Sequence, residues 1–450
     1  MNRDNISNWS FGYFLLKAHI RFFFKRYFRK IIVTGNENIK YDEPIIFASL
    51  HQNALSDPFV VLFNIKKQPV FMARADIFNK PFLIKLLSYF KILPIYRIRD
   101  GRESLQNNDE IFNYAIKILE KKRHLVILPE GSHAMIKKLR ALKKGICRIA
   151  FQAEKNNNYN LGVKIIPVGI EYEHYTKFFK TLYVNFGKPI EIKKYFDLYK
   201  KNPNQAINDL KDELAGEIKK LMINIKSNDY YKTYNELRYI YEHRMKNNLN
   251  LKNLKQPNRL YAHQQLIKCL DNELSNNEES IKHLNDKVKN YVKNLNIYNQ
   301  RDWVIKKGKF SWLNILLHSL YILIFFPLFL YGLINNFLPY IIPYKLSNML
   351  FKDPAYRASA RSVAAAYVFP IFYIIQFFIV KAIFNDYKIA VAYLISITLF
   401  GYFALLYSFS FKKLKSKLKF KIHPKIQGLK KQRQEIIEKT DLIVKKHLSI

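Results

Sequence analysis

Three apolar blocks in the last third of the chain constrain its fold more than any other feature. They span residues 313–338, 368–384 and 389–407. Each is close to the ~20 residues that an α-helix needs to cross a lipid bilayer. We therefore predict a transmembrane α-helical region, which we place at residues 309–411.

The number of membrane crossings follows less directly from these blocks. The basic segment 412–450 is expected to stay cytoplasmic, because Lys and Arg are enriched on that side of membrane proteins. The front of the chain carries no export signal and is expected there too. Two ends on one side need an even number of crossings, whereas three blocks are visible. A re-entrant hairpin at residues 313–343, which hold three prolines, would resolve the mismatch.

The charge of the chain points to an anionic partner. Its formal net charge of +40 comes from 75 Lys and Arg against 35 Asp and Glu. Such an excess attracts nucleic acid, anionic lipid surfaces or phosphorylated substrates. The basic residues flank apolar and aromatic stretches, and no nucleic-acid-binding motif is present. We therefore predict an anionic lipid membrane as a partner and no nucleic acid, although a Lys-rich composition alone would also produce part of this charge.

The first 32 residues read as a helix at the membrane interface. From Trp9 to Ile32, aromatic residues are interleaved with six Lys and Arg. This composition is typical of a helix that lies on an anionic bilayer, and it lacks the cleavage site of a signal peptide. An ordinary amphipathic helix packed on a core is the alternative.

The two cysteines, Cys147 and Cys269, lie far apart and without a CxxC partner. This argues against a disulfide framework or a zinc site and fits a reducing compartment. We predict no metal site and no bound cofactor.

Between the N-terminal helix and the apolar blocks, residues 33–203 alternate short β-rich runs with helical stretches. The expected strands are 45–50, 70–73, 125–128, 165–170 and 182–186. The expected helices are 58–63, 81–89, 109–121 and 145–153. Alternation of this kind predicts an α/β domain with a mixed or parallel sheet flanked by helices. Residues 204–308 then have helical spacing and few strand signals, which predicts a helical extension.

A histidine and an aspartate follow the first of these strands within the run from His51 to Pro58. Across a turn, the Asp57 carboxylate can hold one imidazole nitrogen of His51 as a donor and leave the other as an acceptor. Such a pair can take a proton from a hydroxyl nucleophile. The alternative is that Asp57 caps the following helix, with Pro58 at its first position.

Two arginines, Arg97 and Arg99, lie at the end of an apolar run that begins at Ile92. Guanidinium groups suit bidentate capture of phosphate. Arg74 is a further candidate for the same place. Surface arginines are common, so this pattern is weak by itself.

Polar residues also follow the strand at 125–128, in the run Pro129-Glu130-Gly131-Ser132-His133. Gly131 permits a sharp turn, so that Glu130 and Ser132 can both approach a ligand. Arg140 and Lys143 then precede a helix start that could itself receive an anion. The apolar strand around Pro167 is expected to line the same edge of the sheet.

The order of these blocks resembles the glycerolipid acyltransferase family, which includes glycerol-3-phosphate and lysophosphatidate acyltransferases. That family carries a His…Asp block, an arginine block, a Pro-Glu-Gly block and an apolar block with a central proline. Here these are His51…Asp57, Ile95-Tyr96-Arg97, Pro129-Glu130-Gly131-Ser132 and Ile166-Pro167-Val168. The resemblance covers roughly residues 30 to 190.

The resemblance implies a role for each of these residues. His51 would be the general base and Asp57 its orienting partner. The glycerol phosphate acceptor would be bound by Arg97, Arg99, Glu130, Gly131, Ser132 and Lys143. Pro167 would help to form the site of the acyl donor, an acyl-CoA or acyl carrier protein thioester.

Two departures from the family pattern bear on the substrate. Five residues separate His51 from Asp57, where the usual bacterial pattern has four, and the longer spacing resembles a branch that acylates glycerol 3-phosphate or dihydroxyacetone phosphate. In addition, Ser132-His133 stands where many members have Thr-Arg. The phosphate contact is then left to Arg97, Arg99, Arg140 or Lys143, and His133 is expected to orient the ligand or to be merely polar, rather than to act as a second catalytic histidine.

The sequence thus predicts an integral membrane acyltransferase for glycerol 3-phosphate, with its catalytic domain on the cytoplasmic face. Lysophosphatidate as the acceptor would keep every residue role and stays open. A membrane scaffold that kept the fold and lost the reaction is the alternative from another class, and the intact His51, Asp57, Glu130 and Gly131 argue against it.

Overall fold

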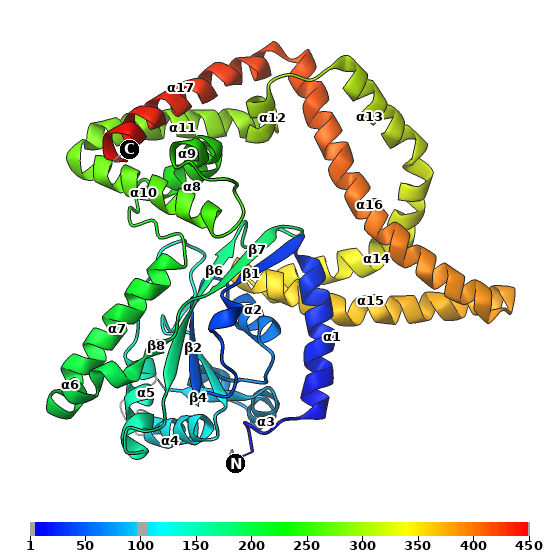
Figure 1. Cartoon of the computed structure of the whole chain (residues 1–450). Coiled ribbons are helices and arrows are strands. Elements are labelled where there is room, and N and C mark those ends of the chain that lie inside the picture. Colours follow the sequence, from blue (N-terminus) through cyan, green and yellow to red (C-terminus); the bar gives the residue numbers. More distant parts are fainter. Residues whose placement is uncertain (1–4, 97–106, 449–450) are drawn as a thin grey trace. The chain divides into compact units, whose positions relative to one another are not determined.

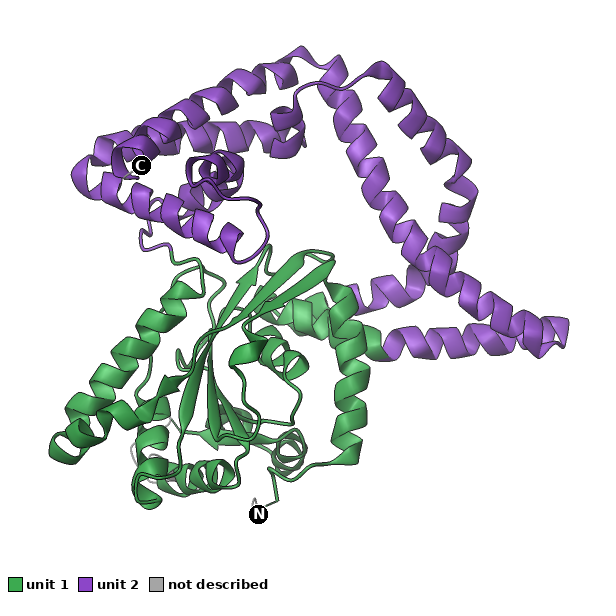
Figure 2. Ribbon diagram, in the orientation of Figure 1, with its two compact units in different colours: residues 1–224, 345–366 green, residues 225–344, 367–450 purple. Residues whose placement is uncertain are grey.

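The computed structural model describes residues 5–96 and 107–448. The chain divides into two compact units (Figure 2). The first comprises residues 1–224 together with 345–366, and the second comprises residues 225–344 and 367–450. Each unit is described by itself below.

The first unit is built on a mixed eight-stranded sheet (Figure 1). Its strands are β1 (Lys30–Thr34), β2 (Ile45–Ser49), β3 (Val70–Arg74), β4 (Ile92–Ile95), β5 (His124–Ile127), β6 (Lys164–Tyr172), β7 (Thr181–Phe186) and β8 (Ile190–Glu191). The order is β1-β7-β6-β2-β5-β3-β4, with β8 paired to β6. Neighbours are parallel except that β7 and β8 run antiparallel to β6.

Helices cover both faces of this sheet. Successive strand residues point to opposite faces, and apolar residues occur on both of them. Ile46 and Ala48 of β2 belong to one buried cluster, and Ile45 and Phe47 belong to the other. The helices of this unit that follow β1 are α2 (Ser56–Asn64), α3 (Pro81–Tyr89), α4 (Asn107–Glu120), α5 (Gly145–Asn156), α6 (Phe196–Lys201) and α7 (Pro203–Lys220). The predicted α/β class and all five predicted strands are confirmed, with ends shifted by no more than two residues.

The start of the chain differs from the prediction in one respect. Helix α1 covers Phe11–Tyr27, and residues 30–34 form β1 instead of continuing the helix to residue 32. The run Ile31-Ile32-Val33-Thr34 is β-branched, which favours a strand, and it pairs in parallel with β7.

Helix α1 has two different apolar faces. Phe24 and Tyr27 are buried in the cluster that lies on the sheet. Trp9 before the helix and Phe11, Phe14 and Phe22 within it are about half exposed or more. One face therefore packs on the core, as in the alternative interpretation, while a second aromatic face remains uncovered.

The first helix of the predicted extension packs against the sheet. Leu210, Leu214 and Ile218 of α7 are buried in the same cluster as Ile46 and Ala48. Gly169 of β6 permits the close approach of the chain after α7, because a Cβ there would lie 2.2 Å from the Leu221 carbonyl oxygen. The α/β unit thus extends to residue 224.

The second unit is helical. Its helices are α8 (Tyr231–Ile240), α9 (Glu242–Asn248), α10 (Asn258–Asn276), α11 (Glu278–Ile297), α12 (Asp302–Lys307) and α13 (Trp312–Ile324), most of α14 (Phe326–Leu350) and of α15 (Pro354–Phe384), and α16 (Tyr387–Ile422) and α17 (Pro424–His447). The basic C-terminal segment is not a free tail, because α17 packs against α10 and α11. Arg433 pairs with Asp302, and Lys446 and His447 pair with Glu273.

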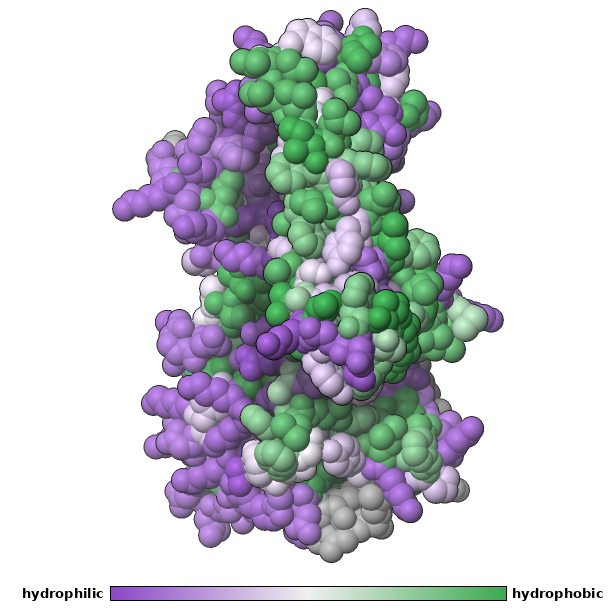
Figure 3. All heavy atoms as spheres, turned by 90° about the vertical axis from the view of Figure 1, so that its right-hand side faces the viewer, coloured by the Kyte–Doolittle hydropathy of each residue, from purple (hydrophilic) through white to green (hydrophobic). Residues whose placement is uncertain are grey.

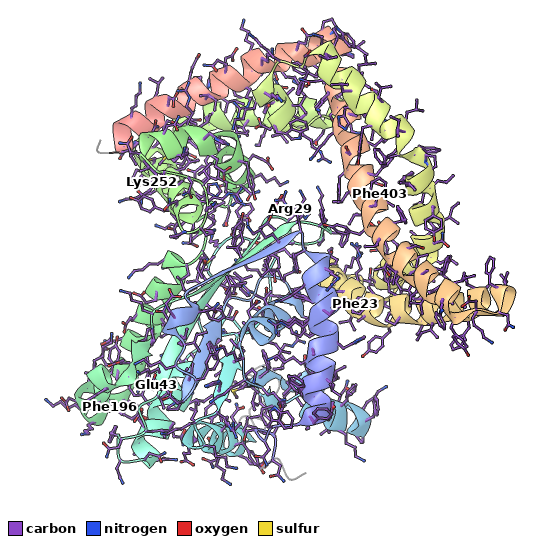
Figure 4. All side chains as sticks on the ribbon, turned by 45° about the vertical axis from the view of Figure 1, so that its right-hand side comes forward. Phe23, Arg29, Glu43, Phe196, Lys252 and Phe403 are labelled. Atoms are coloured by element: carbon purple, nitrogen blue, oxygen red, sulfur yellow. The ribbon has the colours of Figure 1, made fainter. Side chains whose placement is uncertain are left out.

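Three of the described helices, α14, α15 and α16, are long and apolar enough to cross a membrane by length and composition. Their large apolar side chains are mostly uncovered; Phe378, for example, is 58% exposed. Hydrophobic residues accordingly gather on the surface in Figure 3, and Phe403 marks α16 among the side chains of Figure 4. The uncovered apolar surface supports the prediction of a membrane protein.

Buried His124 makes the stability of the first unit sensitive to acid. Burial, with a smaller contribution from Lys67, lowers the pKa of this imidazole from 6.5 to about 4. Between these values the unfolded chain binds a proton that the folded chain does not, so stability must fall as the pH drops through this range.

We expect the His124→Phe variant to lose less stability than the wild type between pH 7 and about pH 4. The measurement is the unfolding midpoint of the purified chain at each pH. A remaining slope is expected, because burial also lowers the pKa of His174 to about 4. An identical slope in both proteins would contradict the prediction.

Candidate active site

His51 and Asp57 form a hydrogen-bonded pair at the carboxyl edge of the sheet. His51 lies two residues after β2, and Asp57 is the second residue of α2. His51 Nδ1 lies 3.2 Å from Asp57 Oδ2. The carboxylate is fully buried, whereas the imidazole is 18% exposed. With Nδ1–H donated to Asp57, Nε2 is left as the proton acceptor.

Asp57 is held in place by three more hydrogen bonds. Its Oδ2 accepts from the backbone N–H of Gln52 and of Asn53, each at 2.6 Å. Its Oδ1 accepts from the Tyr172 hydroxyl at 2.7 Å. Burial and the neighbouring Asp57 raise the pKa of Tyr172 well above its usual range, so the phenol keeps its proton and remains a donor.

Sequence reasoning missed Tyr172. It is the last residue of β6, which pairs in parallel with β2. A usable pattern was present, because Ile166, Val168 and Ile170 alternate along this strand and place Tyr172 on the same face. That face borders Asp57.

The alternative role of Asp57 as a helix cap is not observed. Helix α2 has Leu55 at its N-cap position and no side-chain cap. The Asp57 carboxylate instead turns back to the loop of Gln52 and Asn53. It therefore orders the residues next to His51 rather than the start of α2.

Glu130 joins the His51 loop to the segment after β5. Its Oε2 accepts from the backbone N–H of His51 at 3.0 Å, and its Oε1 accepts from the backbone N–H of Arg140 at 2.9 Å. The Arg140 guanidinium lies 3.2 Å from Oε2. The carboxylate is 1% exposed and holds the backbone of the loop at His51, and the substrate contact of Glu130 stays a prediction.

Gly131 and Ser132 shape the same loop. Gly131 has φ +71°, a left-handed conformation that favours glycine. The Ser132 hydroxyl accepts from Arg140 Nη1 at 2.7 Å, and Arg140 also donates to the Ser132 carbonyl. Arg140 is therefore engaged by this loop and by Glu130.

The predicted phosphate-binding cations differ in how the structure places them. Lys143 is exposed, and its stem passes Gly131, with its Cγ 3.7 Å from where a Cβ on that glycine would lie. Its ammonium makes no hydrogen bond or ion pair within residues 5–96 and 107–448. Arg74 pairs with Asp76. Arg97 and Arg99 lie outside the described residues.

His133 stands beside His51 and is held by residues far along the chain. The two imidazole rings lie 5.5 Å apart at 65°. His133 Nε2 is 2.8 Å from Asp353 Oδ2, and the Tyr356 ring meets the His133 ring edge-on at 5.2 Å. No sequence pattern pointed to Asp353 or Tyr356, because more than 200 residues separate them from His133.

Pro167 lies inside the sheet, beside Ala48 of β2. The Pro167 carbonyl accepts a hydrogen bond from the Gly187 N–H at 2.8 Å. The proline nitrogen, which has no hydrogen, faces the same side of the strand, where the chain passes from β7 to β8. A proline is tolerated here because no ladder hydrogen bond is lost. Its part in an acyl-donor site stays a prediction.

The arrangement can perform general base catalysis. Three neighbouring strands, β6, β2 and β5, bring Tyr172, His51 and Glu130 to one edge of the sheet. The buried Asp57 orients the partly exposed His51, whose free nitrogen can accept a proton from a hydroxyl group. Geometry of this kind suits attack by an alcohol on a carbonyl carbon.

Comparison with known proteins identifies this part of the chain. Residues 30–171 match the model of the acyltransferase family. The 1-acyl-sn-glycerol-3-phosphate acyltransferase of Borreliella burgdorferi is 27% identical over 163 residues, which are 36% of this chain and 59% of that protein. Glycerol-3-phosphate O-acyltransferase 2 of Saccharomyces cerevisiae is 26% identical over 113 residues, 25% of this chain and 15% of that protein.

A solved structure was also found. The 1-acyl-sn-glycerophosphate acyltransferase of Thermotoga maritima is 20% identical and superposes with a TM-score of 0.33, covering 46% of this chain and 81% of that one. The chain spans 59% of the length of the Borreliella relative and 15% of the length of the yeast relative. The segment that contains His51, Asp57 and Glu130 therefore matches the acyltransferase family model.

Proposed function

We propose that this protein is a membrane-bound O-acyltransferase that moves a fatty acyl group from a thioester to glycerol 3-phosphate. The observation that carries the proposal is the pair of His51 and the fully buried Asp57, 3.2 Å apart in a domain of the acyltransferase family. A scaffold that had lost the reaction would have no need for a buried carboxylate with four polar partners, because burying such a charge is costly.

The proposed reaction uses His51 Nε2, the ring nitrogen that is not bonded to Asp57. His51 Nε2 takes the proton of the acceptor hydroxyl as its oxygen bonds to the thioester carbonyl carbon. The Asp57 carboxylate stabilises the imidazolium that forms. The tetrahedral intermediate then collapses, the carbon–sulfur bond breaks, and the imidazolium returns the proton to the thiolate. The products are an ester and a free thiol.

Glycerol 3-phosphate is preferred as the acceptor because five residues separate His51 from Asp57. The yeast relative is named for that acceptor, which supports the same choice. Lysophosphatidate is the second candidate, because the Borreliella relative, matched over a longer stretch, is named for it. The exposed Lys143 is proposed as a phosphate contact in either case, with Arg97 and Arg99 as further candidates.

The membrane supplies the setting for this chemistry. The exposed aromatic residues around α1, together with Lys and Arg of the same helix, suit an anionic bilayer surface. We propose that α1 lies at this interface and that the domain faces the cytoplasm. A lipid-soluble product can then leave directly into the bilayer.

The test is acyl transfer by the full chain in lipid vesicles. Glycerol 3-phosphate and lysophosphatidate are offered separately, each with acyl-CoA or acyl-acyl carrier protein as donor. Product from glycerol 3-phosphate would support the proposal, and product from lysophosphatidate alone would move the assignment to the second acylation step. Turnover of neither acceptor with either donor would contradict both candidates.

A further inference from the structure

Residues 345–366 belong to the α/β unit. They join α14 and α15, two helices that are long enough to cross a membrane. They comprise the end of α14, the connection and the start of α15. Ala358 is 3% exposed within the cluster that contains Ile166 and Val168 of β6. Arg361 reaches the Thr176 carbonyl at 3.4 Å, and His19 of α1 lies 2.8 Å from the Ala366 carbonyl. The segment is therefore a packed part of this unit.

This segment reaches the active site through Asp353 and Tyr356. Asp353 Oδ2 lies 2.8 Å from His133 Nε2. The Tyr356 ring meets the His133 ring edge-on, at an interplanar angle of 88°. Tyr356 is itself stacked on Phe351, with ring centres 5.7 Å apart. His133 is thus paired with an aspartate as His51 is, but through Nε2 instead of Nδ1 and with a half-exposed carboxylate.

Two histidine–aspartate pairs therefore face each other, with their rings 5.5 Å apart. The hydrogen bond to Asp353 makes Nε2 of His133 a donor, so Nδ1 is the ring nitrogen left for another polar group. The same bond holds the pKa of Asp353 below its usual range, so the aspartate is ionised. An imidazole held in this way can accept a hydrogen bond from a hydroxyl group of the acceptor while His51 takes the proton of the attacking hydroxyl.

We propose that residues 345–366 complete the acceptor side of the active site, with Asp353 as a positioning residue that acts through His133. The inference rests on the proposed acyl transfer. Residues 345–366 lie outside residues 30–171, the segment that matches the family model.

The test must separate this role from a second role of Asp353. Its Oδ1 accepts from the Ala355 N–H at 2.9 Å, which caps the start of α15. Asp386 offers a matched control, because it caps α16 in the same way through the Lys388 N–H. Serine is also a good cap but is too short to reach His133, so Asp353→Ser and Asp386→Ser both keep a capping residue.

We expect Asp353→Ser to raise the KM for the acceptor by about 10-fold, the scale of losing one hydrogen bond to a charged group. The KM for the acyl donor should be unchanged, and Asp386→Ser should stay within about twofold of the wild type. Asp353→Asn, which can still accept the hydrogen bond, should recover part of the loss. In a His133→Ala background, Asp353→Ser should have almost no further effect, because the two residues act as a unit.

Different outcomes overturn different claims. Equal effects of the two serine variants, or effects of Asp353→Ser and His133→Ala that multiply, would overturn the inference while leaving the proposed function intact. Unchanged turnover in His51→Ala would instead overturn the proposed function.

Discussion

Replacing His51 with alanine is expected to lower kcat for acyl transfer by about 10² to 10⁴-fold, the usual contribution of a general base. The physical reason is that the variant lacks the imidazole that accepts the proton. Among the described residues, His51 is the only histidine that is hydrogen-bonded to Asp57. The acceptor KM should change little, because the base acts mainly on the chemical step. The measurement is steady-state kinetics with the full chain in vesicles.

The control is His124→Phe, which removes a buried histidine at the opposite end of β5 and should leave kcat within about twofold at neutral pH. Asp57→Asn should lower kcat as well, since an amide no longer stabilises the imidazolium. The double variant of His51 and Asp57 should be no slower than His51→Ala alone. Full activity in His51→Ala would rule out His51 as the base.

Replacing Glu130 with alanine is expected to damage both stability and activity. The change leaves the Arg140 guanidinium without its carboxylate and removes the acceptor of two backbone N–H groups, those of His51 and Arg140. Removing one partner of a buried pair of this kind costs about 3 kcal/mol. The unfolding midpoint should fall by several degrees, and kcat should drop because the His51 backbone is no longer held.

Glu154→Ala is the matched control for this variant. The Glu154 carboxylate is also buried and also accepts from two backbone N–H groups, those of Leu161 and Val163. It lies on α5, away from His51. We expect Glu154→Ala to lower stability to a similar degree while the folded fraction keeps its kcat. A normal kcat in folded Glu130→Ala would show that Glu130 matters for folding alone.

Much of the domain could be predicted because its elements are local in sequence. The runs at 45–50 and 165–170 are short and almost continuously apolar, which is typical of strands that are buried on both faces. Residues 30–32 were assigned to a helix because the basic aromatic pattern before them continued without a break. Their β-branched character decided the strand once β7 was available for pairing.

The candidate site was predicted in part for the same reason. His51 and Asp57 are six residues apart, so a single loop can join them. The inward orientation of Glu130 could not be foreseen, because its partners include a backbone N–H 79 residues away. A carboxylate can accept hydrogen bonds from a substrate or from backbone N–H groups, and only the fold shows the backbone partners of Glu130.

The sequence alone determined the apolar helices, the α/β alternation and the blocks that carry His51, Asp57, Glu130 and Pro167. These features depend on hydrophobic period, turn residues and short spacings, which act within a few residues. The tertiary structure decided which distant groups complete the site: Tyr172 on Asp57, and Asp353 on His133. Contacts over 115 and 220 residues depend on strand order and on the packing of residues 345–366, and no local pattern contains that information.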